Sequence, residues 1–173
     1  LPSDEESEHC ATLLQWDNIY YQPPTDSYVD RKPTVRIGLV QWQMRPYASV
    51  DDLFEQVEFF VDSVSDYKSD FILFPEYFNA PLMARFNDLG EAQSIRKMAQ
   101  YTEEIRDRFR ELAISYNINI ITGSMPYLKD DSLYNVGFLC RRDGSVDMYE
   151  KIHVTPDEQK CWGLSGGSHI QTF

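Results

Sequence analysis

DFILFPEYF, residues 70–78, holds the pattern that decides how this chain folds. Its four apolar residues, Phe71 to Phe74, are typical of a short strand that is buried on both faces of a sheet. The run stops at Pro75, and the next residue is a carboxylate, Glu76. An acid directly after a buried strand needs an explanation, because acids are seldom buried without a partner. The flanking sequence provides one.

Strand and helix patterns alternate on both sides of this stretch. The spacing of apolar residues switches between β-branched runs and the three-to-four-residue period of amphipathic helices. Ser49 is a suitable N-cap, because its hydroxyl can accept a hydrogen bond from the first helical turn. The predicted elements are, in chain order, a strand over 34–43, a helix from Ser49 to about Tyr67, the strand over 71–74, a helix over about 91–116, and a strand over 118–122 that Gly123 closes.

A hairpin is predicted after these elements. YNVGFLC (134–140) and SVDMYEKIH (145–153) are joined by RRDG (141–144), a turn with glycine where a positive φ is wanted. The whole order is strand, helix, strand, helix, strand and hairpin. It predicts an α/β fold with a mixed sheet and helices on at least one face.

The composition restricts the classes of partner. The 173 residues fit one domain, and their 28 acidic and 16 basic side chains give a net charge of -12. This charge disfavours binding to nucleic acid or to an anionic membrane. No apolar run approaches the roughly 20 residues that span a bilayer. Three widely spaced cysteines (Cys10, Cys140 and Cys161) argue against a disulfide framework and predict a reducing cytoplasm.

Residues 1–33 differ from the rest of the chain. Aromatic residues over 11–21 predict a strand, and three prolines after it predict a linker. The first residues, LPSDEESEH, lack the basic start and the apolar segment of a signal peptide. A first residue other than methionine indicates a fragment or a processed product. We expect residues 1–33 to be the tail of a preceding domain plus a linker, and residues 34–173 to begin another domain.

Three side chains are candidates for chemistry. Glu76 lies at the carboxyl end of a strand, where loops of an α/β sheet diverge and leave a crevice. It can act there as a general base, or it can cap the next segment or pair with Arg85 at the surface. Lys151 ends the second hairpin strand and can stabilise an oxyanion, or it can be a solvated strand-end lysine. Glu158 can point back to the same place, or it can be an exposed turn acid.

Metal, cofactor and thiol sites have less support. The three histidines have no partner at a metal-ligand spacing, and no CxxC or HxxxH motif occurs, so we expect no metal site. Gly166-Gly167 lacks the other glycines of a nucleotide fingerprint, and we expect no cofactor. Cys161 lies near His153 in sequence, which invites a Cys–His pair. We interpret it as a bystander, because it lies in a glycine-rich loop without a strand-to-helix elbow.

Four motifs together resemble the nitrilase superfamily of carbon–nitrogen hydrolases. They are VRIGLVQWQMRP at the first strand, FPEYF around Glu76, YNVGFLCRRDG around Asn135 and YEKIHVTPDE around Lys151. Each is weak alone, but the set is specific in this order and spacing. The resemblance covers 34–173, about the N-terminal half of that domain, and implies part of a four-layer α-β-β-α sandwich. Residues 1–33 more loosely resemble the end of an acetyltransferase-type domain, as in bacterial fusions of such a domain with a carbon–nitrogen hydrolase.

The resemblance also implies roles for the site residues. The family attacks an amide or nitrile carbon with a glutamate, a lysine and a nucleophilic cysteine. By motif, Glu76 is the general base, Lys151 stabilises the tetrahedral oxyanion, and Glu158 is the second, assisting glutamate. The family's cysteine comes on the next strand, beyond this chain, and neither Cys140 nor Cys161 matches it. This polypeptide by itself should not turn over substrate, because the members of such a triad act as a unit.

Three hypotheses compete on these observations. The chain is a piece of an active hydrolase, a catalytically inactive binding module of this fold, or a regulatory segment tethered to an acetyltransferase. We favour the first, because an inactive module has no physical need for Glu76, Lys151 and Glu158 together. The expected partners are an amide, ureido or nitrile substrate, the remainder of the hydrolase domain, and further copies of the protein. Unpaired strand edges and an uncovered apolar face would invite such association.

Overall fold

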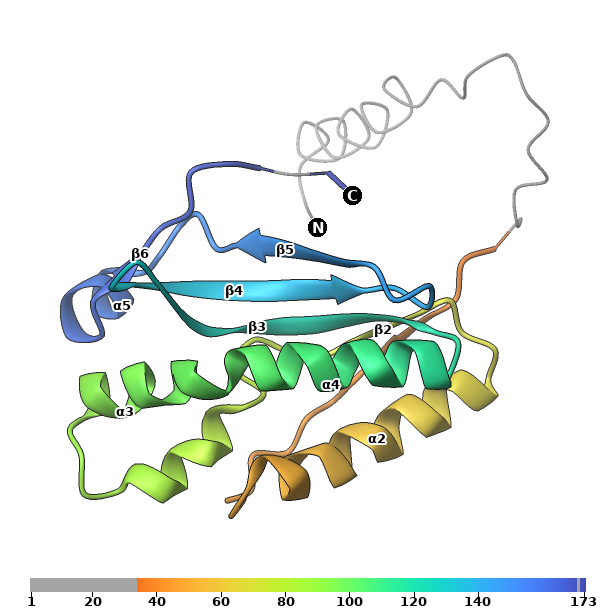
Figure 1. The fold of residues 1–173 in the computed structure, drawn as a ribbon, viewed down its shortest axis with the longest axis horizontal. Helices are drawn as coiled ribbons and strands as arrows, with labels where there is room; N and C mark the ends of the chain where they lie inside the picture. The colour runs from red at the N-terminus through yellow and green to blue at the C-terminus, as the bar shows by residue number, and fades with distance from the viewer. Residues whose placement is uncertain (1–33, 171) are drawn as a thin grey trace, which may run out of the picture. The chain divides into compact units, whose positions relative to one another are not determined.

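Residues 34–170 and 172–173, which the computed structural model describes, form one mixed sheet with helices against it (Figure 1). The strands β1, β2 and β3 are parallel, β3, β4 and β5 are antiparallel, and β6 pairs parallel to β4. They are β1 (Ile37–Leu39), β2 (Phe71–Leu73), β3 (Asn119–Lys129), β4 (Ser132–Cys140), β5 (Val146–Glu150) and β6 (Leu164–Ser165). The predicted α/β fold with a mixed sheet is confirmed. The predictions for residues 1–33 lie outside the described residues.

Helices α2 and α4 lie together on one side of the sheet (Figure 1). The helices are α2 (Val50–Asp66), α3 (Glu91–Met98), α4 (Thr102–Ser115) and α5 (Pro156–Cys161), with 3-10 helices η1 (Ala80–Phe86) and η2 (Ala99–Tyr101). Phe109 of α4 packs edge-on against Phe54 of α2 and against Phe74 after β2, with ring centroids 5.2 and 5.1 Å apart. These buried rings join the two helices to the sheet in one close-packed core.

Helix α2 begins where the sequence predicts. The Ser49 hydroxyl is the N-cap and accepts a hydrogen bond of 3.0 Å from the backbone N–H of Asp52. Asp51 and Asp52 lie in the first turn, where carboxylates interact favourably with the helix dipole. A cap of this kind stabilises a helix by about 1 kcal/mol. The predicted N-cap and the amphipathic helix behind it are confirmed.

The first strand is shorter than the sequence predicts. The β-branched pattern spans 34–43, but only Ile37–Leu39 form β1. The chain then turns into the core, because the Trp42 ring packs against Phe74 and Phe78 at centroid distances of 6.0 and 5.9 Å. The packing of this partly buried ring thus accompanies the end of a strand that the β-branched pattern would have continued.

The helix predicted over 91–116 is two helices, α3 and α4, with η2 between them. Thr102, the first residue of α4, is fully buried, and its hydroxyl donates a hydrogen bond of 2.5 Å to the Pro126 carbonyl of β3. This contact with the sheet fixes where α4 starts. Helical periodicity carries no information about such a contact, so the prediction of one continuous helix was wrong.

The strand predicted over 118–122 continues as β3 to Lys129. Gly123, its predicted end, instead lies where the register of β3 against β4 shifts, in a bulge. Its φ of +71° lies in the left-handed region that glycine favours. The glycine therefore bends this strand without ending it.

The sheet face opposite α2 is apolar and partly exposed. Ile37 and Leu39 of β1 are 56% and 74% exposed, and their partners in β2, Phe71 and Leu73, are half-buried. The predicted burial of β2 on both faces is therefore wrong for the described residues. In a four-layer sandwich this face packs against a second sheet, which would account for its apolar side chains. The expected association of the isolated chain stays a prediction.

Candidate active site

Glu76 lies in the segment after β2, whose backbone is held against β3. The Phe74 N–H donates to the Ile121 carbonyl at 2.9 Å, and the Tyr77 N–H donates to the Ser124 carbonyl at 2.7 Å. Glu76 lies between these two anchors. Its position at the end of the strand is therefore set by β3, which is distant in sequence.

Two uncommon backbone conformations, at Gly123 and Tyr77, let the segment that carries Glu76 lie close to β3. A Cβ atom at Gly123 would lie 2.2 Å from the Pro75 carbonyl oxygen, so a residue with a side chain would displace the segment that carries Glu76. Tyr77 has a φ of +55°, in the left-handed region that residues other than glycine rarely adopt. Backbone strain of this kind concentrates at functional sites, where surrounding contacts hold it in place.

Lys151 follows β5 directly, and its backbone is held on both sides. Its N–H donates to the Asn135 carbonyl of β4 at 2.8 Å, and its carbonyl accepts from the Gly167 N–H at 2.9 Å. The lysine side chain is 24% exposed. It therefore differs from the freely solvated strand-end lysine that the sequence left open.

Glu158 is held by a capping box at the start of α5. The Thr155 hydroxyl accepts from the Glu158 N–H at 3.2 Å, and Glu158 Oε2 accepts from the Thr155 N–H at 2.7 Å. This reciprocal pair satisfies two N–H groups of the helix end and fixes the carboxylate. The Glu158 side chain is only 6% exposed, so the alternative of an exposed turn acid is wrong.

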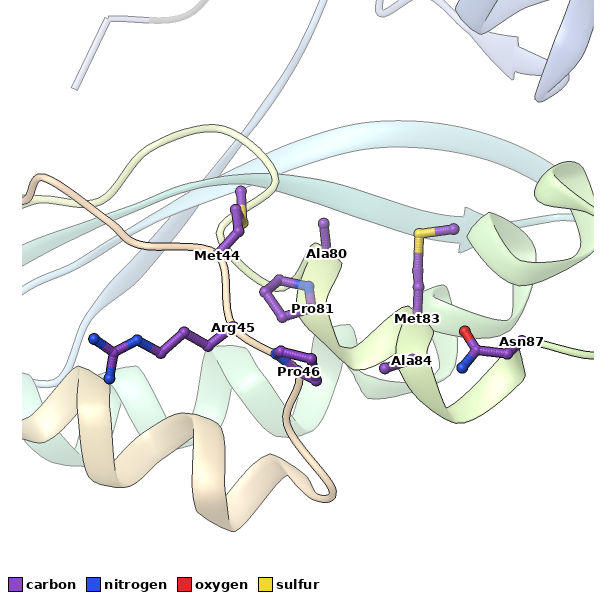
Figure 2. A pocket seen from close by; sticks show the side chains of 8 residues that line it. All are labelled: Met44, Arg45, Pro46, Ala80, Pro81, Met83, Ala84 and Asn87. Carbon is purple, nitrogen blue, oxygen red and sulfur yellow. The ribbon is translucent and has the colours of Figure 1, made fainter.

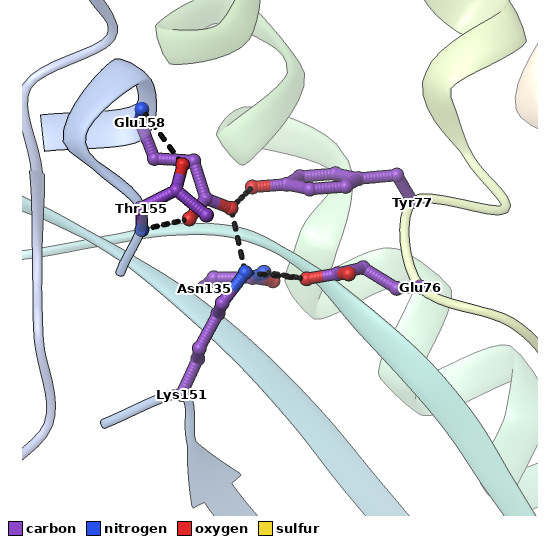
Figure 3. A network of polar contacts seen from close by, with 6 residues as sticks. All are labelled: Glu76, Tyr77, Asn135, Lys151, Thr155 and Glu158. Atoms are coloured by element: carbon purple, nitrogen blue, oxygen red, sulfur yellow. Dashed lines mark hydrogen bonds and ion pairs between the residues drawn. The ribbon is translucent and has the colours of Figure 1, made fainter. Parts of the chain in front are cut away.

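These three side chains converge in one cluster (Figure 3). Lys151 Nζ lies 3.1 Å from Glu76 Oε1 and 2.8 Å from Glu158 Oε1. Glu76 and Lys151, which the resemblance assigns to one triad, are therefore in direct contact. The Glu76 side chain is 48% exposed, whereas Glu158 is almost fully covered. The lysine is thus held between a buried carboxylate and an open one.

The charges of this cluster stabilise one another. Burial lowers the pKa of Lys151, but hydrogen bonds to Glu158 and Glu76 outweigh it, and the lysine pKa is raised. Burial raises the pKa of Glu158, but hydrogen bonds from Lys151 and Thr155 outweigh it, and the pKa of this carboxyl is lowered. An ammonium group next to a permanent carboxylate is therefore the stable state of the site near neutral pH.

Two neutral side chains complete the cluster, and sequence reasoning assigned neither of them a role. The Tyr77 hydroxyl donates to Glu158 Oε1 at 3.1 Å, and Asn135 Nδ2 donates to Glu76 Oε1 at 2.7 Å (Figure 3). Burial and the nearby Glu158 charge raise the pKa of Tyr77, which keeps it a donor. Asn135 carried a usable signal, because a polar side chain in an apolar strand needs a partner. Tyr77 carried none.

The two cysteines of the described chain do not join this cluster. Cys140 is buried in β4, and burial raises the pKa of its thiol to about 12. Cys161 is exposed and ends α5, so its predicted place in a loop was wrong. No hydrogen bond links either thiol to the cluster. Residues 34–170 also contain no group of histidine, cysteine and acidic side chains that could hold a metal ion, and none of their helices is long and apolar enough to cross a bilayer.

An apolar pocket of about 410 Å³ lies between η1 and the segment that follows β1 (Figure 2). Its lining residues are Met44, Arg45, Pro46, Ala80, Pro81, Met83, Ala84 and Asn87. None of them belongs to the charged cluster. The pocket is therefore separate from the site built on Glu76 and Lys151.

Known proteins are similar to this chain in sequence. The profile of the carbon-nitrogen hydrolase family matches residues 36–172. The probable hydrolase YhcX of Bacillus subtilis (strain 168) is 38% identical over 174 residues, which is 100% of this chain and 34% of that protein. The hydrolase in the agr operon of Staphylococcus lugdunensis is 27% identical over 107 residues, 61% of this chain and 43% of that protein. The chain thus spans about a third of the first relative and less than half of the second.

Solved structures share the fold. The carbon-nitrogen hydrolase from Helicobacter pylori G27 superimposes with a TM-score of 0.62 at 17% identity, over 78% of this chain and 45% of that one. The amidase from Nesterenkonia sp. AN1, solved in complex with butyramide, gives 0.57 at 20% identity, over 78% and 49%. At these identities the likeness establishes the nitrilase-type fold alone, of which this chain spans about half.

Proposed function

The chain belongs to the carbon-nitrogen hydrolase family, and on that premise we propose that it supplies the base and the oxyanion-binding cation of an enzyme that hydrolyses a non-peptide carbon–nitrogen bond. The bond is that of an amide, a ureido group or a nitrile. Because the chain spans only part of its relatives, the activity is proposed for the complete protein that contains it.

One observation carries this proposal: Lys151 Nζ lies 3.1 Å from a half-exposed Glu76 and 2.8 Å from a buried Glu158. A general base needs an accessible oxygen, and Glu76 has one. An oxyanion needs a cation whose position is fixed before the reaction, and the two carboxylates fix Lys151.

For an amide substrate, the proposed reaction passes through a covalent thioester. Glu76 takes the proton of a cysteine thiol that we place beyond Phe173, and the thiolate attacks the amide carbon. Lys151 stabilises the oxyanion of the tetrahedral intermediate. The intermediate expels the amine, which takes the proton from Glu76. Glu76 then removes a proton from water, whose oxygen attacks the thioester, and the returning thiol takes up a proton as the acid is released.

Glu158 has an assisting role in this scheme. Its carboxylate is the permanent counter-ion of Lys151, so the lysine keeps its charge when Glu76 becomes protonated during turnover. The hydrogen bonds from Tyr77 and Thr155 leave Glu158 poorly placed to exchange protons. We therefore assign it to the electrostatics of the lysine and not to proton transfer.

An inactive binding or regulatory module is the second candidate. The observation in its favour is that Cys140 and Cys161, the two cysteines of the described residues, make no hydrogen bond to the charged cluster. The similarity to YhcX, of which this chain covers 34%, leaves room for further domains in the complete protein. In either case we propose that residues 1–33 are the tail of an acetyltransferase-type domain, and that the protein self-associates in the cytoplasm.

Ammonia release from short amides, ureido compounds and nitriles by the complete protein tests the enzymatic proposal. Lys151→Met should lower kcat about 100- to 1,000-fold, as expected for removal of one oxyanion donor. Lys97→Met, at an exposed lysine of α3, is the matched control and should leave kcat unchanged. Full activity of Lys151→Met would refute the assignment.

A thiol-reactive substrate analogue tests the position of the nucleophile. In the complete protein it should label a cysteine beyond Phe173, which peptide mapping by mass spectrometry identifies. Labelling of Cys161 instead would refute the proposed mechanism. Absence of both hydrolysis and labelling would favour the inactive module.

A further inference from the structure

The two oxygens of Glu76 have different surroundings. Oε1 accepts two hydrogen bonds, one of 2.7 Å from Asn135 Nδ2 and one of 3.1 Å from Lys151 Nζ. Each carboxylate oxygen offers about two lone-pair sites, so these two donors occupy Oε1 fully. No donor among the described residues contacts Oε2. The half-exposed side chain therefore has one oxygen with two donors and one oxygen with no donor among the described residues.

Asn135 connects both members of the ion pair. Its backbone carbonyl accepts from the Lys151 N–H at 2.8 Å, while its side-chain amide donates to Glu76. The residue is fully buried in β4, so its rotamer has little freedom. One asparagine thereby fixes the base of the lysine side chain and the head of the glutamate relative to each other.

The other side-chain atom of Asn135 is not used. Its Oδ1 is buried and has no hydrogen-bond partner among the described residues. A buried acceptor without a donor is costly. Leucine has the same number of side-chain heavy atoms and no such cost, so stability alone would not favour asparagine here. The hydrogen bond from Asn135 Nδ2 to Glu76 is the contact that offsets the cost of the unpaired Oδ1.

We propose that Asn135 is a positioning residue which, together with Lys151, occupies Oε1 of Glu76 and leaves Oε2 as the oxygen that accepts the proton. The inference rests on the proposed function of Glu76 as the general base. The two donors fix the orientation of the carboxylate and therefore the position of its second oxygen. Asn135 itself contacts no reacting atom.

Two substitutions in the complete protein test this role. Asn135→Leu removes the donor and the orphaned acceptor together. We expect kcat to fall about tenfold or more, within the range of general-base effects, with KM within about twofold of the wild type and a thermal midpoint no lower. Asn135→Asp places a second carboxylate against Oε1, and the acidic limb of the pH–rate profile should move to higher pH by about one unit or more.

Ser94→Ala is the matched control. Ser94 is buried in α3, and its hydroxyl donates to the Phe86 carbonyl at 3.3 Å without touching the charged cluster. This variant should lower the thermal midpoint and leave kcat and the pH profile unchanged. If the kcat and the thermal midpoint of Asn135→Leu both fall, the role of Asn135 is structural and the proposal is overturned.

The activities of the wild type and of Glu76→Gln distinguish a failure of this inference from a failure of the proposed function. Hydrolysis by the wild type that is lost in Glu76→Gln supports the function of Glu76. If Asn135→Leu then keeps the wild-type kcat, or Asn135→Asp keeps the wild-type pH profile, the role of Asn135 is wrong while the function stands. Full activity of Glu76→Gln would refute the proposed function itself.

Discussion

The segment that carries Glu76 and the helix end that carries Glu158 offer a carboxylate to the same ammonium group in opposite ways. Both oxygens of Glu158 are occupied, by Lys151, Tyr77 and Thr155, and its side chain is 6% exposed. Glu76 uses one oxygen and is 48% exposed. One ion-pair cluster thus contains a carboxylate with both oxygens hydrogen-bonded and another with only one oxygen hydrogen-bonded.

The largest expected difference between the two acids is in catalysis. Glu76→Gln should lower kcat/KM of the complete protein about 100- to 10,000-fold, because it removes a general base. Glu158→Gln should lower it less, since the lysine keeps one carboxylate partner. Steady-state kinetics on both variants measures the ratio. Equal losses in the two variants would contradict the division of roles.

The backbone beneath Glu76 should show the next largest effect. Gly123→Ala forces a Cβ into the Pro75 carbonyl and adds backbone strain of about 1–3 kcal/mol. We expect a lower thermal midpoint and a lower kcat, because the Glu76 segment must move. Gly163→Ala is the control, since Gly163 also has a positive φ, +73°, but no atom within 4 Å of the added Cβ. It should lose stability and keep kcat. Equal kcat in both variants would contradict the close-approach argument.

The buried acid should govern how stability depends on pH. Because the folded pKa of Glu158 is lowered from its ordinary value of 4.5, its stabilisation is present above that ordinary value and is lost as pH falls through the folded value. The thermal midpoints of the wild type and Glu158→Gln should therefore differ most near neutral pH and approach each other as the pH falls through the lowered pKa. A difference that persists unchanged in acid would mean that the carboxylate charge is not what stabilises this end of α5.

We expect the smallest effect from loss of the hydrogen bond between Tyr77 and Glu158, which links the two regions. Tyr77→Phe removes the hydrogen bond from the hydroxyl to Glu158 and should lower the free energy of unfolding by about 1 kcal/mol. The ring also packs edge-on against Trp162 at 5.8 Å, and phenylalanine keeps this contact. Denaturant titration of the complete protein measures the change. A loss of several kcal/mol would show that Tyr77 does more than connect the two carboxylates.

The sequence by itself predicted the elements whose signals are local. The apolar period and the Ser49 cap predicted α2, and the glycine turn predicted the hairpin of β4 and β5. The motifs around Glu76 and Lys151 assigned both residues to one triad by resemblance. These features depend on neighbouring residues or on a resemblance between short stretches, and both can be read along one chain.

Only the tertiary structure determined which side chains of the site contact one another. The contacts of Glu76 with Asn135 and of Tyr77 with Glu158 join residues 59 and 81 positions apart. The break before Thr102 accompanies a contact between α4 and β3, and the passage of β3 through Gly123 accompanies a register shift between β3 and β4. Local propensity cannot encode such contacts, because each depends on which strands become neighbours after folding. The pattern of residues supplied the charged groups, and the packing of the sheet determined which oxygen of Glu76 stays free.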